Sequence, residues 1–227
     1  MTTTYTKAIE LNSEGVALMT ARNYSSARLK FKKAIELFKD YKVAVDTRKR
    51  PLTRSTPSVD FSWSDCINYR SIPLQHSAPQ CFIYARPLLI LSTSEFPDSV
   101  ECHAETAAVL YNIGLSFHLE GHSSNHSSSL LSRAMKAYKM ALKFRKRGNS
   151  WGKLRGDRLL NVAIHNNMAM IHQEFMDNSA ARTCFITVSR GLHALGQSGF
   201  LEHNEYQGVF MNLMMGAQSQ NTSAAAA

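Results

Sequence analysis

The sequence predicts an all-α protein in which about seven helices pair into stacked hairpins. Apolar residues recur every three or four positions over most of the chain, which is the spacing of one helix face. Gly15 and Ala169 are each followed, at steps of 12, 4 and 3, by Ala, an aromatic residue and a small apolar residue, and Gly114 starts the same series with a first step of 20. Helix axes about 8–10 Å apart require small residues where they cross. These steps therefore predict helices that reverse direction and pack on themselves.

The first hairpin is followed by a stretch of different character. Two helices with apolar residues on one face form the predicted hairpin: Thr4–Ala21 and Tyr24–Val45. All six prolines lie between Pro51 and Pro97. Because proline removes a backbone donor and disfavours helix at the preceding residue, residues 42–101 are predicted to be a Pro-rich insert. Within it, residues 66–72 and 80–91 are rich in aromatic and branched side chains, which indicates a partly strand-like arm.

Polar and glycine-containing stretches divide the rest of the chain into further helices. Asp98 or Ser99, directly after Pro97, is suited to start a helix because its side chain accepts from the free amides of a first turn. The run Gly121–Ser129, mostly Ser, Asn and His, predicts a flexible loop, and residues 217–227 are expected to be a flexible tail. The helices predicted after the insert are Val100–Leu119, Leu130–Arg147, Asp157–Phe175, Ser179–Leu195 and Glu202–Met215.

The positions of these residues resemble tetratricopeptide repeats, and three segments carry the resemblance: residues 8–41, 107–148 and 162–195. The first holds Leu11, Gly15, Leu18, Tyr24, Ala27, Phe31, Ala34 and Leu37 at the positions of the family. The second holds Leu110, Asn112, Ile113, Gly114, Leu131, Ala134, Tyr138 and Ala141. The third holds Asn167, Met168, Ala169, His172, Ala181 and Phe185.

The resemblance implies a single domain over residues 1–227, coiled as a right-handed superhelix of hairpins and closed by a capping helix at 202–216. It also implies a non-catalytic scaffold that binds a peptide or protein segment in a concave groove. The chain departs from the family because residues 42–101 separate the first two repeats and residues 121–129 lengthen the second. Direct stacking of the first two repeats is therefore left open.

The resemblance also implies which side chains face the groove. The candidate peptide-binding residues are Asn12, Tyr111, Asn112, His118, Asn166, Asn167 and Gln173. An asparagine amide donates and accepts at once, so it suits the backbone of an extended peptide. Asn112 and Asn167 occupy the same position in successive repeats. Of the residues with which co-chaperone members of the family clamp a C-terminal carboxylate, only Asn112 is present, so chaperone tails are not expected as partners.

Two other interpretations of the groove stay open. In one, the asparagines only cap or solvate its wall and bind no peptide. In the other, the arm from Cys66 to Leu91 lies in the groove as an occupant supplied by the chain itself.

Positive charge gathers in one region. Residues 133–158 contain ten Lys and Arg and a single acid, Asp157, for a net charge of +9, which equals that of the whole chain. A basic stripe of one helix face is predicted from Arg133, Lys136, Lys139, Lys143 and Arg147. The stripe is either an ordinary solvated face or a docking surface for an acidic partner, RNA or an anionic membrane. An adaptor acting through this stripe is the alternative function.

Composition limits the remaining classes of protein. The chain has no apolar run of 18 residues and no secretory leader at its start, so an intracellular protein, cytoplasmic or nuclear, is expected. Its four cysteines are scattered, which argues against a disulfide framework and a thiolate zinc site. His118, His122 and His126 lie four apart, but Gly121 is expected to interrupt their helix. No catalytic residues, metal site or cofactor are therefore predicted.

Overall fold

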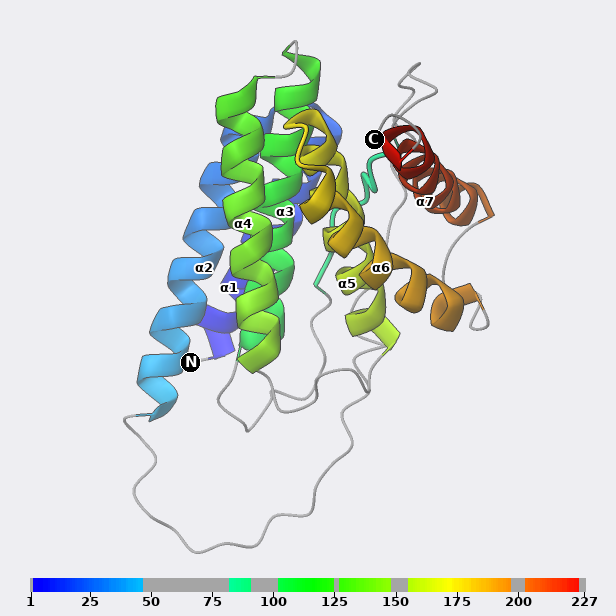
Figure 1. Ribbon diagram of the computed structural model, residues 1–227. Coiled ribbons are helices and arrows are strands. Elements are labelled where there is room, and N and C mark those ends of the chain that lie inside the picture. Colours follow the sequence, from blue (N-terminus) through cyan, green and yellow to red (C-terminus); the bar gives the residue numbers. More distant parts are fainter. Residues whose placement is uncertain are drawn as a thin grey trace, which may run out of the picture. The chain divides into compact units, whose positions relative to one another are not determined.

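The computed structural model describes residues 2–46, 82–90, 102–124, 127–147, 155–196 and 203–224. In these ranges the protein consists of α-helices and one extended segment, residues 82–90 (Figure 1). The helices are α1 (Thr2–Thr20), α2 (Tyr24–Asp46), α3 (His103–Ser123), α4 (Ser128–Arg147), α5 (Arg155–Glu174), α6 (Asn178–Gly196) and α7 (His203–Ala224). The prediction of an all-α protein with about seven helices is confirmed for this part of the chain.

The helices fall into two compact units. Unit 1 contains α1 to α4 and residues 86–90, and unit 2 contains residues 82–85 and α5 to α7. Consecutive helices pack as antiparallel hairpins: α1 with α2, α3 with α4, and α5 with α6 (Figure 1). In unit 1, α2 also packs on α3, and in unit 2, α6 packs on α7. The predicted arrangement in sequential hairpins is therefore confirmed.

Small residues lie where the hairpin helices approach most closely, as predicted. Ala27 and Ala134 are fully buried and Ala181 is 3% exposed. A Cβ atom added to Gly114 would lie 2.7 Å from Cδ1 of the Tyr138 ring, and one added to Gly15 would collide with the ring of Phe31. Each glycine thus leaves room for the aromatic side chain of the partner helix, which is the physical reason for a small residue at these two positions.

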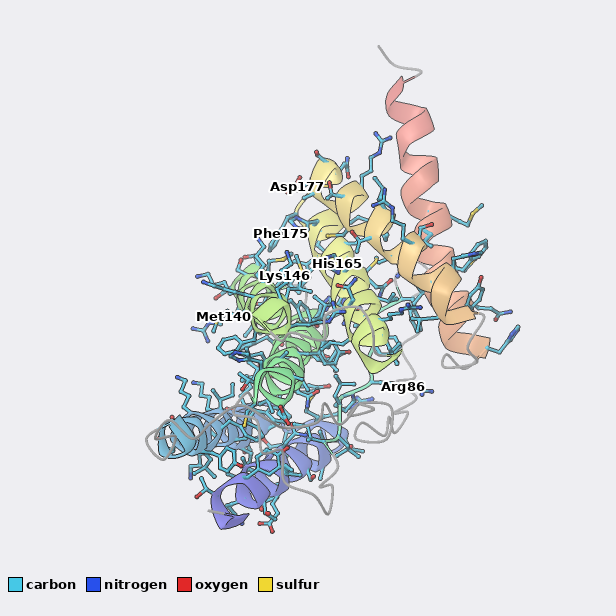
Figure 2. The ribbon with its side chains drawn as sticks, turned by 90° about the horizontal axis from the view of Figure 1, so that it is seen from below. Arg86, Met140, Lys146, His165, Phe175 and Asp177 are labelled. Carbon is cyan, nitrogen blue, oxygen red and sulfur yellow. The ribbon has the colours of Figure 1, made fainter. Side chains whose placement is uncertain are left out.

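The first and third hairpins turn in the same way. Arg22 and Met176 each follow the first helix with a positive φ, 58° and 57°. The next residues donate back to the helix, Asn23 to the carbonyl of Leu18 at 2.9 Å and Asp177 to that of His172 at 2.8 Å. The side chains of Asn23 and Asp177 then accept from the backbone of the following helix, at 3.2 and 3.1 Å. Phe175 and Asp177 mark the second turn in Figure 2.

The two hairpins of unit 1 pack directly on each other. Arg28 of α2 pairs with Glu120 of α3 at 2.6 Å, and the hydroxyl of Tyr5 in α1 donates to Glu105 of α3 at 2.8 Å. The question that the sequence left open, whether residues 42–101 keep the first two hairpins apart, is thus answered: the hairpins are neighbours in unit 1.

Three boundaries differ from the predictions. The loop predicted at residues 121–129 is too long at both ends, because α3 continues to Ser123 and α4 begins at Ser128. Gly121 does not interrupt the helix; it is buried, and a Cβ there would lie 3.1 Å from Cβ of Leu130. Helix α3 begins at His103, and the predicted start at residues 97–100 lies outside the described residues. Helix α7 continues to Ala224, into the predicted tail.

Four large apolar side chains of α7 are exposed: Tyr206, Phe210, Met211 and Met214.

Replacing Gly114 with alanine is expected to lower the free energy of unfolding by about 2 kcal/mol, because the new methyl group forces the buried Tyr138 ring out of its place. Urea denaturation followed by circular dichroism measures the change. Combining Gly114→Ala with Tyr138→Leu should cost less than the sum of the two single changes, because the smaller side chain makes room. Strict additivity would contradict the close approach.

Candidate peptide-binding site

The extended segment, residues 82–90, is held mainly through its backbone. In extended chain the N–H and C=O of one residue point to the same side, and the side alternates from residue to residue. The backbone groups bonded by helix side chains belong to Phe82, Tyr84, Arg86 and Leu88, every second residue. Within each unit, alternate residues of the segment therefore present their backbone groups to polar side chains of that unit's helices.

In unit 1, Asn112 of α3 binds both backbone groups of Leu88. Its Oδ1 accepts from the Leu88 N–H at 2.7 Å, and its Nδ2 donates to the Leu88 carbonyl at 2.9 Å. Asn12 of α1 donates to the same carbonyl at 3.0 Å and accepts the second Asn112 proton at 3.0 Å. The hydroxyl of Tyr111 donates to the Arg86 carbonyl at 3.1 Å. Asn12, Tyr111 and Asn112 are fully buried, so these bonds form away from water.

In unit 2, two asparagines repeat this arrangement. Asn167 of α5 accepts from the N–H of Tyr84 at 2.8 Å and donates to its carbonyl at 3.1 Å. Asn212 of α7 accepts from the N–H of Phe82 at 3.1 Å and donates to its carbonyl at 2.7 Å. Asn166 donates to the Phe82 carbonyl at 3.0 Å and accepts from Asn212 at 2.8 Å. All three asparagines are buried.

The side chains of the segment are packed as well. Tyr84 and Leu88 are each 1% exposed, and Ile90 is also buried. A Cβ atom at Gly208 of α7 would collide with the ring of Phe82, so only glycine leaves room for that ring on α7. Each unit therefore combines backbone hydrogen bonds to the segment with a few apolar contacts.

Five of the seven predicted groove residues bond the part of the segment that lies in their own unit. Asn12, Tyr111, Asn112, Asn166 and Asn167 all bond the segment. The asparagines are buried and bonded to the backbone of residues 82–90, and binding of a separate peptide stays a prediction. The rest of the arm Cys66–Leu91 lies outside the described residues.

Two predicted groove residues are placed otherwise. His118 is buried beside Tyr138 of α4, with 3.4 Å between its Nδ1 and the hydroxyl, so it belongs to the contact between α3 and α4. Gln173 lies half-buried near the end of α5. Sequence reasoning missed Asn212. The sequence does contain a signal for it: Asn212 is the single polar residue of the otherwise apolar run Val209–Met214. Asn112 is likewise flanked by the apolar side chains of Tyr111 and Ile113.

The basic stripe lies on the exposed face of α4. Arg133, Lys136, Lys139 and Lys143 are all exposed, as predicted. The side chain of Arg147 lies outside the described ones. Figure 2 shows Met140 and Lys146 on the same helix. Whether any partner binds the stripe is a separate question, considered below.

Helix α3 of unit 1 carries two buried ionisable groups, Glu105 and His118. Burial lowers the pKa of His118 to about 3, with a smaller contribution from the charge of His122, so the imidazole is neutral at physiological pH. Burial raises the pKa of Glu105, although its own backbone and the Tyr5 hydroxyl bond it and act in the opposite direction. Both groups therefore favour the uncharged form in the folded protein.

These shifts predict how stability depends on pH. His118 contributes stability above its unfolded pKa of 6.5, and this contribution is lost as the pH falls towards its folded pKa of about 3. Glu105 acts in the opposite sense, because its contribution is present below its unfolded pKa of 4.5 and is lost as the pH rises. Between the two unfolded pKa values, 4.5 and 6.5, the contributions of His118 and Glu105 to the free energy of unfolding change with pH in opposite directions. Each contribution is therefore best measured with the other group removed.

In Glu105→Gln, the free energy of unfolding should fall by up to about 1.4 kcal/mol for each pH unit below 6.5, because only the unfolded state gains the His118 proton. Urea denaturation between pH 7 and pH 5 measures this slope. The double variant Glu105→Gln with His118→Gln is the control and should lose it. An unchanged slope in the double variant would show that His118 is not the responsible group.

The described residues form neither a metal-binding cluster nor a membrane-spanning helix. No group of three or more His, Cys, Asp or Glu side chains is placed to hold a metal ion in the described part of the chain. Within the same ranges, every helix is too short or too polar to cross a membrane. Cys102 and Cys184 are buried, and Cys66 and Cys81 lie outside the described residues.

Comparison of the chain with models of protein families, with curated proteins and with solved structures gave no match. The resemblance to tetratricopeptide repeats rests on the residues quoted above and remains a prediction.

Proposed function

We propose that the protein is a non-catalytic interaction scaffold that binds extended peptide segments through asparagine side chains of its odd-numbered helices. The observation that carries the proposal is the repeated two-point contact, in which Asn112, Asn167 and Asn212 each bond the N–H and the C=O of one residue. Residues 82–90 act as the peptide supplied by the chain itself. A partner peptide of the same form would take their place.

Three features support a repeat scaffold of the tetratricopeptide type. The first and third hairpins share the positive-φ turn at Arg22 and Met176. All three hairpins bury an alanine in their second helix, Ala27, Ala134 and Ala181, each followed four residues later by an aromatic residue. Asn112 and Asn167, at one position of two repeats, make the same pair of bonds in their separate units. In such a scaffold the first helix of each hairpin lines the binding surface, which is the role of α1, α3 and α5 here.

The contacts define the class of peptide. Bonds to N–H and C=O do not depend on the side chain, but they exclude proline at the bonded positions because proline has no N–H. The buried side chains of Tyr84 and Leu88 require apolar or aromatic residues at those positions. Proline at the intervening position is accepted, as Pro87 shows. The preferred partner is therefore an extended, largely apolar segment.

Binding in trans has to compete with a ligand that belongs to the same chain. A tethered ligand has an effective concentration in the millimolar range or above, which lowers the apparent affinity for any free peptide. The intact protein is thus expected to bind a free peptide weakly, and weakening the internal segment should increase that affinity.

A labelled peptide with the sequence of residues 80–91 tests the proposal. Fluorescence anisotropy should show at least about tenfold tighter binding to the full chain carrying Tyr84→Gly and Leu88→Gly than to the unaltered protein. Adding Asn112→Ala and Asn167→Ala to that variant should abolish the binding, and circular dichroism should verify that the helices are retained.

A matched pair of peptides identifies the chemistry. Methylation of the backbone nitrogens at positions 84 and 88 removes the two bonded protons and should abolish binding. Methylation at positions 83 and 85 is the control and should be tolerated, because these amides point to the other side of the segment. Equal binding of both peptides would contradict recognition through the backbone.

A further inference from the structure

The exposed face of α4 carries charge of one sign. Helix α4 contains no acidic residue, and its exposed side chains include Arg133, Lys136, Lys139 and Lys143. An ordinary solvated helix looks different in the same unit. On α2 the exposed residues Lys32, Lys33 and Lys39 are accompanied by the exposed acids Glu36 and Asp40. The positive charge of α2 is therefore partly offset by acids on the same helix, whereas that of α4 is not.

The lysines of this face have no acidic partner in the described part of the chain. The ion pairs there join other residues, such as Lys30 with Glu14 and Arg28 with Glu120, and Lys136, Lys139 and Lys143 take part in none. Arg133 lies with its guanidinium 5.7 Å from the centre of the Phe117 ring. Three ammonium groups on one stripe are thus left to bind a negatively charged partner.

We infer that this face of α4 docks an acidic protein segment that carries apolar side chains among its carboxylates. Lys136, Lys139 and Lys143 are three and four residues apart, so they rise by about 4.5 and 6 Å along the helix. Carboxylates at the same spacing on a partner helix match these distances. Met140 lies among the lysines and is 48% exposed, which gives the partner an apolar contact at the centre of the charged face.

A nucleic acid fits this face less well. Single-stranded RNA is held by aromatic side chains on which its bases stack, in addition to phosphate contacts. The aromatic residues of α4 are turned inward: Tyr138 is fully buried, and Phe144 packs against His103. The ring of Phe117 is occupied by the guanidinium of Arg28 at 4.3 Å and by that of Arg133. The face offers charge and an aliphatic side chain but no stacking surface.

Two labelled probes test this inference on the full chain: a synthetic helical peptide with Glu three and four residues apart, as the lysines are, and Leu on the same face, and a 20-nucleotide single-stranded RNA. The α4 variant reverses charge by Lys136→Glu, Lys139→Glu and Lys143→Glu. Its matched control makes the same change of net charge on α2, by Lys32→Glu, Lys33→Glu and Lys39→Glu. A third variant, Met140→Ser, removes the apolar contact and leaves the charge unchanged.

The expected result is that the acidic peptide binds the unaltered protein, loses at least about tenfold in affinity with the α4 reversal and keeps its affinity with the α2 reversal. Met140→Ser should weaken the peptide severalfold. Equal losses in the two reversals would show attraction by net charge alone and would overturn the inference. Tighter binding of RNA than of the peptide at the same salt concentration, unaffected by Met140→Ser, would overturn it in favour of a nucleic-acid surface.

Discussion

Replacing Asn112 with alanine is expected to lower the free energy of unfolding by about 3 kcal/mol or more. The change removes two hydrogen bonds to Leu88 and one to Asn12, all among fully buried groups. It leaves the Leu88 N–H and the Asn12 Oδ1 without these partners, and each unsatisfied buried polar group costs about 1–3 kcal/mol. Urea denaturation measures the loss.

The matched control is Asn178→Ala. Asn178 is an exposed asparagine at the first position of α6, so its loss should change stability by less than about 0.5 kcal/mol. If Asn112→Ala were as mild as this control, the hydrogen bonds to the segment would contribute nothing to holding unit 1 together.

Proline at residue 84 is expected to release the segment from unit 2. The change removes the backbone N–H that donates a hydrogen bond to Oδ1 of Asn167. It also removes a tyrosine side chain that is 1% exposed. Alanine at the same position separates the two effects, because it loses the ring and keeps the N–H. Tyr84→Pro should therefore be less stable than Tyr84→Ala by about 2 kcal/mol.

Residue 83 supplies the control for this comparison. Ile83 lies between two bonded residues, is half-buried, and has no acceptor for its N–H among the described residues. Ile83→Pro and Ile83→Ala should therefore have similar stabilities. The same difference between proline and alanine at both positions would show that proline acts by stiffening the chain and not by removing a bonded proton.

The hairpins could be predicted from the sequence because their causes are local. Helical periodicity is carried by neighbouring residues, and Gly15 and Gly114 each contact an aromatic residue of the next helix in the chain, Phe31 and Tyr138. The predicted helix ends are mostly within a few residues of those observed. The predicted loop at residues 121–129 was too long because Gly121 was interpreted as a turn residue. In the structure Gly121 lies within α3, where its lack of a side chain permits close packing against Leu130.

The site was predictable only in part, because it depends on contacts between distant residues. The repeat spacing indicated Asn112 and Asn167, but Asn212 lies beyond the three repeats and no spacing pointed to it. The same spacing assigned His118 to the groove, whereas the structure turns it against Tyr138. That residues 82–90 lie on these asparagines follows from segments up to 130 residues apart in the chain, and no local pattern specifies such a pairing.

Amide hydrogen exchange along the segment tests the central claim most directly. If asparagines hold alternate backbone groups, the amides of Phe82, Tyr84 and Leu88 should exchange slowly in NMR spectra of the full chain, and those of Ile83 and Ala85 should exchange much faster. Asn167→Ala should remove the protection of Tyr84. Uniform exchange along residues 82–88, or fast exchange at Tyr84 and Leu88, would contradict the account.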